Sequence, residues 1–166
     1  MIKLKSDNWA DITNSHDALF SSKSGVWETP IDLYNELDRE FCFNVDVCAT
    51  AENAKHTFYF TESDDGLSKT WDGVAWCNPP YGRTVGRWIT KGIDQVQNNE
   101  RCRAVVYLLP ARTDTAWFHR LIWDRSSNHP RTGVEVRFLK GRLKFGQSTT
   151  GAPFPSMVVV IRKVSA

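Results

Sequence analysis

A short apolar run, Val74 to Cys77, leads directly into the turn Asn78-Pro79-Pro80-Tyr81. Gly73 and Pro79 bound this run, which predicts a buried strand that stops at the turn. Pro79 and Pro80 hold φ near about −65° and have no backbone N–H, so the turn presents carbonyl oxygens and the Asn78 amide. Hydrogen-bond acceptors at the carboxyl end of a buried strand lie where open α/β sheets bind ligands, and these acceptors suit an amino group.

The other apolar patterns alternate between the strand and the helix period, and an all-β stretch follows them. Strands are predicted at 41–48, 56–61, 74–77, 103–110, 134–139, 143–145 and 156–161. Helices are predicted at 30–40, at 85–96, and after a cap at Thr113 or Asp114. Strands that alternate with helices form parallel sheets, whereas the last strands follow one another directly. We therefore expect an α/β fold with a mostly parallel sheet and an antiparallel edge hairpin.

The length of 166 residues, with 41% hydrophobic and 24% charged residues, suits one domain with a single core. Residues 1–25 are polar and show no sustained period, which predicts an N-terminal arm ahead of a domain at 26–166. No apolar run is long enough for a membrane span, and the N-terminus lacks a signal-peptide core. A cytoplasmic protein without a membrane partner is therefore expected.

Neither cysteine nor histidine spacing predicts a metal site. The four cysteines contain no Cys-x-x-Cys pair and have apolar neighbours, so we expect reduced and mostly buried thiols. The four histidines show no ligand spacing, and no metal is expected.

The net charge of +2 conceals a strong asymmetry between the two halves of the chain. Residues 1–82 hold six Lys and Arg against fourteen Asp and Glu, which gives −8. Residues 83–166 hold fifteen against five, which gives +10. A basic half of this kind is typical of a surface that binds phosphates, although a solvated surface paired with the acidic half is an alternative.

Six blocks of the sequence, in order, resemble the phage-encoded DNA N6-adenine methyltransferases, and the likeness runs from about residue 26 to the end. The blocks are residues 27–30, 46–50, 64–67, 76–82, 109–115 and 140–145. The resemblance implies one catalytic domain with the class I, Rossmann-like fold that uses S-adenosylmethionine. Only 31 residues separate Asp46 from Asn78, and Cys48-Ala49-Thr50-Ala51 replaces the usual glycine-rich loop. A compact, truncated variant of the fold is therefore expected.

The resemblance also implies a set of site residues. The catalytic candidates are Asn78, Pro79, Pro80 and Tyr81. The Asn78 side-chain oxygen and the Pro79 carbonyl would each accept a hydrogen bond from the adenine amine, and Tyr81 would stack on a base rotated out of the duplex. The cofactor candidates are Trp27, Thr29, Pro30, Asp46, Cys48, Ala49, Asp64 and Asp65. Asp46 is the first choice for the ammonium group of the cofactor, although a buried Asp at a strand end can also simply cap the next turn.

Contacts to double-stranded DNA are expected from the basic half. The candidates are Arg83, Arg87, Lys91, Arg112, Lys140, Arg142 and Lys144. The chain has no room for a large recognition domain, so base reading would use residues 124–133, the hairpin or the arm. A short recognition site and a monomer or weak dimer are expected, acting in the cytoplasm of a bacterial host.

The sequence is also compatible with two other kinds of function. The same acceptors could present cytosine N4 or a protein glutamine to the cofactor, although the basic charge disfavours a protein substrate. A non-catalytic nucleic-acid-binding module is also conceivable, because the glycine-rich loop is missing.

Overall fold

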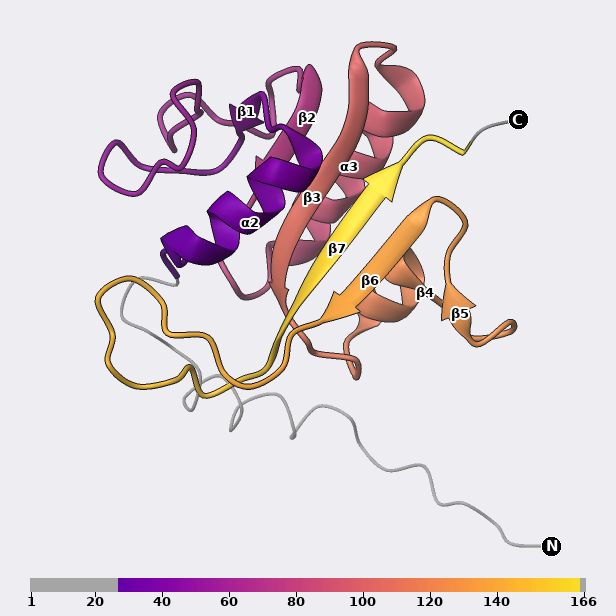
Figure 1. Cartoon of the computed structure of the whole chain (residues 1–166). Helices are drawn as coiled ribbons and strands as arrows, with labels where there is room; N and C mark the ends of the chain where they lie inside the picture. Colours follow the sequence, from indigo (N-terminus) through magenta and orange to yellow (C-terminus); the bar gives the residue numbers. More distant parts are fainter. Residues whose placement is uncertain (1–26, 165–166) are drawn as a thin grey trace, which may run out of the picture.

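A mixed sheet with strand order β1-β2-β3-β7-β6 forms the centre of the molecule in a computed structural model that describes residues 27–164 (Figure 1). The strands are β1 (Val45–Asp46), β2 (Gly73–Cys77), β3 (Cys102–Pro110), β6 (Val134–Phe138) and β7 (Ser156–Arg162). β1, β2 and β3 run parallel, and β7 lies antiparallel between β3 and β6. The predicted α/β fold with an antiparallel edge hairpin is confirmed. The predicted arm at 1–25 lies outside the described residues.

Two helices cover opposite faces of this sheet (Figure 1). α2 (Ile31–Phe41) buries Tyr34 and Leu37 against one face. α3 (Val85–Asn98) packs its apolar side, which includes Trp88 and Ile89, against the other. Both helices were predicted from apolar residues at the helical period, and each turns that apolar stripe toward the sheet.

Three predicted strands differ from the structure. Only Val45–Asp46 of the predicted strand 41–48 forms a strand, because α2 extends to Phe41 and Cys42 then takes a left-handed conformation with φ 53°. The predicted strand 56–61 forms a single parallel bridge, between Asp46 and Tyr59. Residues 143–145 belong to an irregular connection from β6 to β7. The parallel part of the sheet is therefore short, in agreement with a compact variant.

Residues 111–133 also depart from the prediction. Thr115, rather than Thr113 or Asp114, accepts a hydrogen bond from the Phe118 N–H, and the helix is short, with a π-helical turn η1 (Phe118–Ile122). The predicted loop 124–133 contains a small hairpin of β4 (Trp123–Asp124) and β5 (His129–Pro130). Of the four cysteines predicted to be mostly buried, Cys77 and Cys102 are buried, Cys48 is partly buried and Cys42 is exposed.

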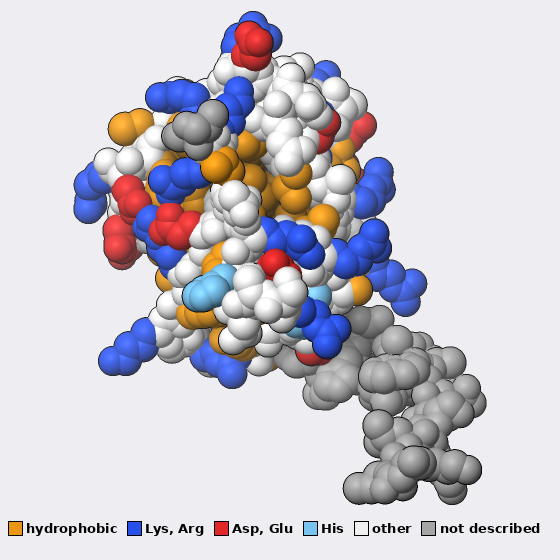
Figure 2. All heavy atoms as spheres, turned by 90° about the vertical axis from the view of Figure 1, so that its right-hand side faces the viewer, with side chains coloured by type: hydrophobic (Ala, Val, Ile, Leu, Met, Phe, Trp, Pro, Cys, Tyr) orange, Lys and Arg blue, Asp and Glu red, His pale blue; other side chains and the backbone are white. Residues whose placement is uncertain are grey.

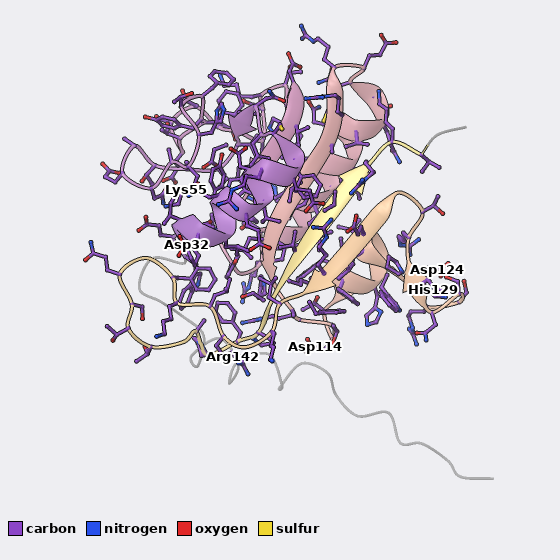
Figure 3. All side chains as sticks on the ribbon, viewed as in Figure 1. Asp32, Lys55, Asp114, Asp124, His129 and Arg142 are labelled. Atoms are coloured by element: carbon purple, nitrogen blue, oxygen red, sulfur yellow. The ribbon has the colours of Figure 1, made fainter. Side chains whose placement is uncertain are left out.

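One edge of the sheet gathers the loops that the sequence marks as functional. The carboxyl ends of β2 and β3 lie at the lower edge in Figure 1, and the connection from β6 to β7 lies on that edge as well. Figure 3 shows Asp114, from the loop after β3, and Arg142, from the β6–β7 connection, at this edge. Asp124 and His129 mark the small hairpin, at the right of Figure 3.

Candidate active site

A cleft of about 410 Å³ opens where β1 and β2 end. Its walls are the segment 27–29, the loop from Val47 to Gly66, and the turn that follows β2. The predicted site residues that line it are Trp27, Thr29, Asp46, Cys48, Ala49, Asp65, Asn78, Pro79 and Pro80. This volume is in the range of pockets that bind small molecules, and the position matches the ligand site of open α/β sheets.

A second groove, at the β6 edge, holds none of the predicted site residues. It is lined by Ile93, Val96, Gln97, Leu121, Arg131, Thr132, Val134, Ile161, Arg162, Lys163 and Val164. Figure 2 shows hydrophobic side chains in a hollow surrounded by Lys and Arg on this side of the molecule. The first cleft is therefore the candidate active site.

The amide of Asn78 is held in one orientation. Its Nδ2 donates to the Trp27 carbonyl oxygen and, at 3.0 Å, to Thr29 Oγ1. Its Oδ1 is buried and has no hydrogen-bond partner among the described residues. Buried polar atoms without a partner are rare and costly, so an unpaired acceptor at a cleft indicates a ligand that donates a hydrogen bond.

Asp46 is the most buried carboxylate in the cleft, with 2% of its surface exposed. Oδ1 accepts the Cys48 N–H at 3.3 Å and Oδ2 accepts the Lys55 N–H at 3.0 Å. Burial raises the pKa of Asp46, and the two backbone hydrogen bonds oppose that rise. The side chain thus does cap the turn after β1. A carboxylate has further lone pairs, so it can also accept from a cationic ligand.

An ion pair that the sequence did not reveal lies in the wall of the cleft. Lys55 Nζ lies 2.9 Å from Glu28 Oε1, and both residues line the cleft. Lys55 is also the residue whose backbone N–H donates to Asp46. Figure 3 shows Lys55 near the start of α2, where Asp32 is labelled. Residues 27 places apart meet here only through the fold, so no local sequence pattern could have identified the pair.

Tyr81 lies in an aromatic cluster beside the cleft rather than among its lining residues. Its ring stacks on Trp27 with centroids 6.5 Å apart and contacts Phe145 and Phe154 edge-on. Its hydroxyl donates to the Leu108 carbonyl at 3.3 Å. Because Trp27 lines the cleft and Phe145 and Phe154 belong to the β6–β7 connection, the cluster joins the cleft to that connection.

Two further cofactor candidates do not line the cleft. Pro30 precedes α2, and its carbonyl accepts the Tyr34 N–H at 3.1 Å. Asp64 accepts from the Thr61 N–H and hydroxyl, and these hydrogen bonds lower the pKa of Asp64. Of the adjacent pair, Asp65 is the residue that lines the cleft.

Cys48 is unsuited to act as a nucleophile at neutral pH. Burial raises the pKa of its thiol to about 12, and the neighbouring Asp46 and Glu62 add to that rise. The reactive form of cysteine is the thiolate, so this side chain serves as an uncharged part of the wall.

Five of the seven predicted DNA-binding residues belong to loops at the carboxyl edge of the sheet, and one of them, Arg83, follows β2. The other four are Arg112, after β3, and Lys140, Arg142 and Lys144, in the β6–β7 connection. Arg83 lies in the turn ahead of α3, and Arg87 and Lys91 lie on α3 itself. α3 leads away from this edge (Figure 1).

Comparisons with known proteins agree with one another. The model of the DNA N-6-adenine-methyltransferase (Dam) family matches residues 17–166. The DNA N-6-adenine-methyltransferase of Escherichia phage T1 is 25% identical over 169 residues, which cover 92% of this chain and 67% of that protein. The enzyme of the same name from Haemophilus phage HP1 (strain HP1c1) is 27% identical over 143 residues, which cover 84% of this chain and 79% of that protein.

Among solved structures, the crystal structure of the 23S rRNA methyltransferase ErmE resembles the chain. It has a TM-score of 0.38 and 13% identity, and the alignment covers 83% of this chain and 51% of that one.

Proposed function

The chain belongs to the DNA N-6-adenine-methyltransferase (Dam) family, and we propose that it transfers the methyl group of S-adenosylmethionine to an adenine rotated out of double-stranded DNA. The enzyme is a DNA N6-adenine methyltransferase with a compact class I fold. The observation that supports an amine as the methyl acceptor is the unpaired Asn78 Oδ1 at the cleft. An exocyclic amine would supply the hydrogen-bond donor that this oxygen lacks.

Asn78 and Pro79 would prepare the amine for attack. The lone pair of an aromatic amine is delocalised into the ring, so the nitrogen is a weak nucleophile. If Asn78 Oδ1 and the Pro79 carbonyl each accept one N–H, the nitrogen moves toward tetrahedral geometry and its lone pair is directed along one line. Such positioning contributes on the order of 7–11 kcal/mol in favourable systems. S-adenosylmethionine, when bound, supplies a methyl group that its sulfonium already activates.

The cleft fits this cofactor in size and in chemistry. Asp46 would accept from the ammonium group, since it is a buried carboxylate with lone pairs to spare. Trp27, Thr29, Cys48, Ala49 and Asp65 would form the walls. Pro30 and Asp64 would act on these walls indirectly, through the start of α2 and the turn at 61–64.

Glu62 is the candidate residue to bind the ribose hydroxyls of the cofactor. The segment before it runs parallel to β1, because Asp46 N–H donates to Phe58 and Phe60 N–H donates back to Asp46. Glu62 lines the cleft just beyond this segment. An acidic residue at the end of the strand next to the first one is the usual partner of ribose hydroxyls in nucleotide-binding sheets.

The cofactor affinity is expected to fall on acidification. Burial raises the pKa of Asp46, so the carboxyl takes up a proton at a higher pH than an ordinary aspartate does. The ammonium group needs the ionised form, so binding releases a proton and weakens as the pH falls through that raised pKa. Calorimetry from about pH 8 to about pH 5 measures this dependence. Asp46→Asn should bind weakly at every pH, and a wild-type profile parallel to that of the variant would contradict the role of Asp46.

The aromatic cluster of Trp27, Tyr81, Phe145 and Phe154 would support the flipped base. Tyr81 is held at the end of the Asn78-Pro79-Pro80 turn, so its ring would border the base while the cluster keeps the ring in place. Base–aromatic contact offsets part of the few kcal/mol that unstacking costs.

Phosphates are expected to bind the basic loops of the carboxyl edge. Replacing Lys140, Arg142 and Lys144 together with alanine should weaken DNA binding and flatten its salt dependence, by about 0.9 in slope for each phosphate that the variant no longer neutralises. Fluorescence anisotropy of a labelled duplex over a salt series measures the slope. Arg101→Ala is the matched control, because Arg101 lies just ahead of β3, at the opposite end of that strand, and pairs with Asp72 at 3.2 Å. Equal slopes for the two variants would contradict the assignment.

Base reading is assigned to the small hairpin β4–β5 and the β6–β7 connection, which together allow a short recognition site. Among the described residues, no helix is long and apolar enough to cross a membrane. Action in the cytoplasm of a bacterial host, as a monomer or weak dimer, completes the proposal.

One experiment tests the reaction and the acceptor atom together. Plasmid DNA is incubated with the protein and methyl-labelled S-adenosylmethionine, and its nucleosides are analysed by mass spectrometry. Labelled N6-methyladenine is the expected product. Labelled N4-methylcytosine would overturn the choice of base. Bound cofactor without any labelled nucleoside would indicate an RNA or protein acceptor, and absent cofactor binding would favour the non-catalytic module.

A further inference from the structure

We propose that Thr29 is a positioning residue that, together with the Trp27 carbonyl, holds the Asn78 amide with Oδ1 free for the substrate, and that this arrangement makes the site select an amino group over a carbonyl group. The inference rests on the proposed function, in which Asn78 Oδ1 faces the methyl acceptor. It adds a residue that acts through Asn78 rather than by touching the substrate.

The polarity of the amide follows from the Trp27 carbonyl, and Thr29 adds a second partner for the same Nδ2. The Trp27 carbonyl oxygen can only accept a hydrogen bond, so the Asn78 atom that faces it must be the donor Nδ2. The second Nδ2 hydrogen goes to Thr29 Oγ1 at 3.0 Å. In the reversed orientation, Oδ1 would face the Trp27 oxygen, and two acceptors would repel each other. The orientation that satisfies Nδ2 twice is the one that leaves Oδ1 unpaired.

This polarity determines which chemical group the site accepts. An exocyclic NH2 can donate to Oδ1, whereas a ring carbonyl would place its oxygen against another acceptor. A site with a buried acceptor therefore rejects a ligand that cannot donate, because both oxygens would lose their hydrogen bonds with water. Adenine carries the amine at the position where hypoxanthine carries an oxygen.

Thr29 is the part of this arrangement that a substitution can remove. The Trp27 partner is a backbone oxygen, which every residue supplies, whereas Thr29 supplies a side-chain oxygen. Thr29 is buried, with 4% of its surface exposed, and it precedes Pro30, which favours an extended backbone at Thr29. A valine has nearly the same shape and lacks the acceptor. With one of two anchors gone, the amide rotates more freely and Oδ1 spends less time facing the amine.

The test compares Thr29→Val with Thr29→Ser, which keeps the oxygen. For Thr29→Val we expect kcat for DNA methylation to fall about tenfold, the usual scale of one hydrogen bond. The Kd for S-adenosylmethionine should change less than kcat does, because valine keeps the shape of the cofactor wall. Thr29→Ser should keep most of the wild-type kcat. In an Asn78→Ala background, Thr29→Val should lower kcat no further, because Thr29 affects the amine only through the Asn78 amide.

Competition provides a second readout. A duplex with hypoxanthine at the target position should inhibit methylation of the adenine duplex more strongly with Thr29→Val than with the wild-type protein. If Thr29→Val is unstable, Thr29→Ala replaces it in the same comparisons. The inference is overturned if Thr29→Val loses cofactor affinity at unchanged kcat, or if it slows the reaction equally with and without Asn78. A wild-type protein that methylates no DNA would instead refute the proposed function.

Discussion

Replacing Asn78 with alanine is expected to lower kcat for DNA methylation by roughly 10²–10³-fold, the scale seen when a positioned hydrogen-bonding group is removed from a reacting centre. The amine would lose the acceptor that localises its lone pair. The cofactor should still bind, because its proposed partners, chiefly Asp46, are untouched. Single-turnover assays with labelled cofactor, beside calorimetric Kd values, separate these two effects.

Asn98→Ala is the matched control for this variant. Asn98 is the last residue of α3, is exposed, and donates to Asp94 at 2.8 Å, far in the chain from the turn after β2. Its removal should leave kcat unchanged. If Asn78→Ala instead loses cofactor affinity and kcat in the same proportion, Asn78 belongs to the cofactor wall and the proposed contact with the amine is wrong.

The sequence predicted the elements whose signal is local and strong. α3 has a complete apolar face, and β3 and β7 are long buried runs, so each could be identified without its neighbours. The prediction of a strand at 143–145 was wrong because Phe145 is apolar for a reason other than strand formation. Its ring packs on Trp27 and Tyr81, which produces a buried aromatic residue in an irregular loop.

The site was predictable only in part, for a related reason. Asn78 and Asp46 follow strands, and residues that follow parallel strands meet at one edge of the sheet. Glu28 and Lys55 follow no such rule, since they pair in the cleft wall only after segments 27–29 and 47–66 have folded together. Likewise, no pattern shows that Tyr81 turns into an aromatic cluster while Asn78, three residues earlier, faces the cleft.

Gly66→Ala is expected to raise the Kd for S-adenosylmethionine by roughly 10–100-fold, which corresponds to the cost of overpacking a tight contact. A Cβ at Gly66 would overlap the Val47 carbonyl oxygen and lie 3.3 Å from the Trp88 ring. Neither side can move easily. Val47 N–H donates to the Trp76 carbonyl, and the Gly66 carbonyl accepts from Trp71 Nε1 at 2.8 Å. The added methyl group therefore forces the loop out of its tight contact with Val47. Asp65, the preceding residue, moves with the loop.

Gly86→Ala is the control for this substitution, because its added Cβ would meet only Trp117 Cβ, at 3.4 Å, and alanine favours a helix. Calorimetry gives Kd and thermal melting gives stability for both variants. Gly66→Ala with a lowered melting temperature and a wild-type Kd would show that the loop is not part of the cofactor wall. At saturating cofactor, Gly66→Ala should recover most of its kcat, because Asn78 and its anchors remain in place. The loss in Asn78→Ala should persist at any cofactor concentration, so the two variants separate the binding of the cofactor from the activation of the amine.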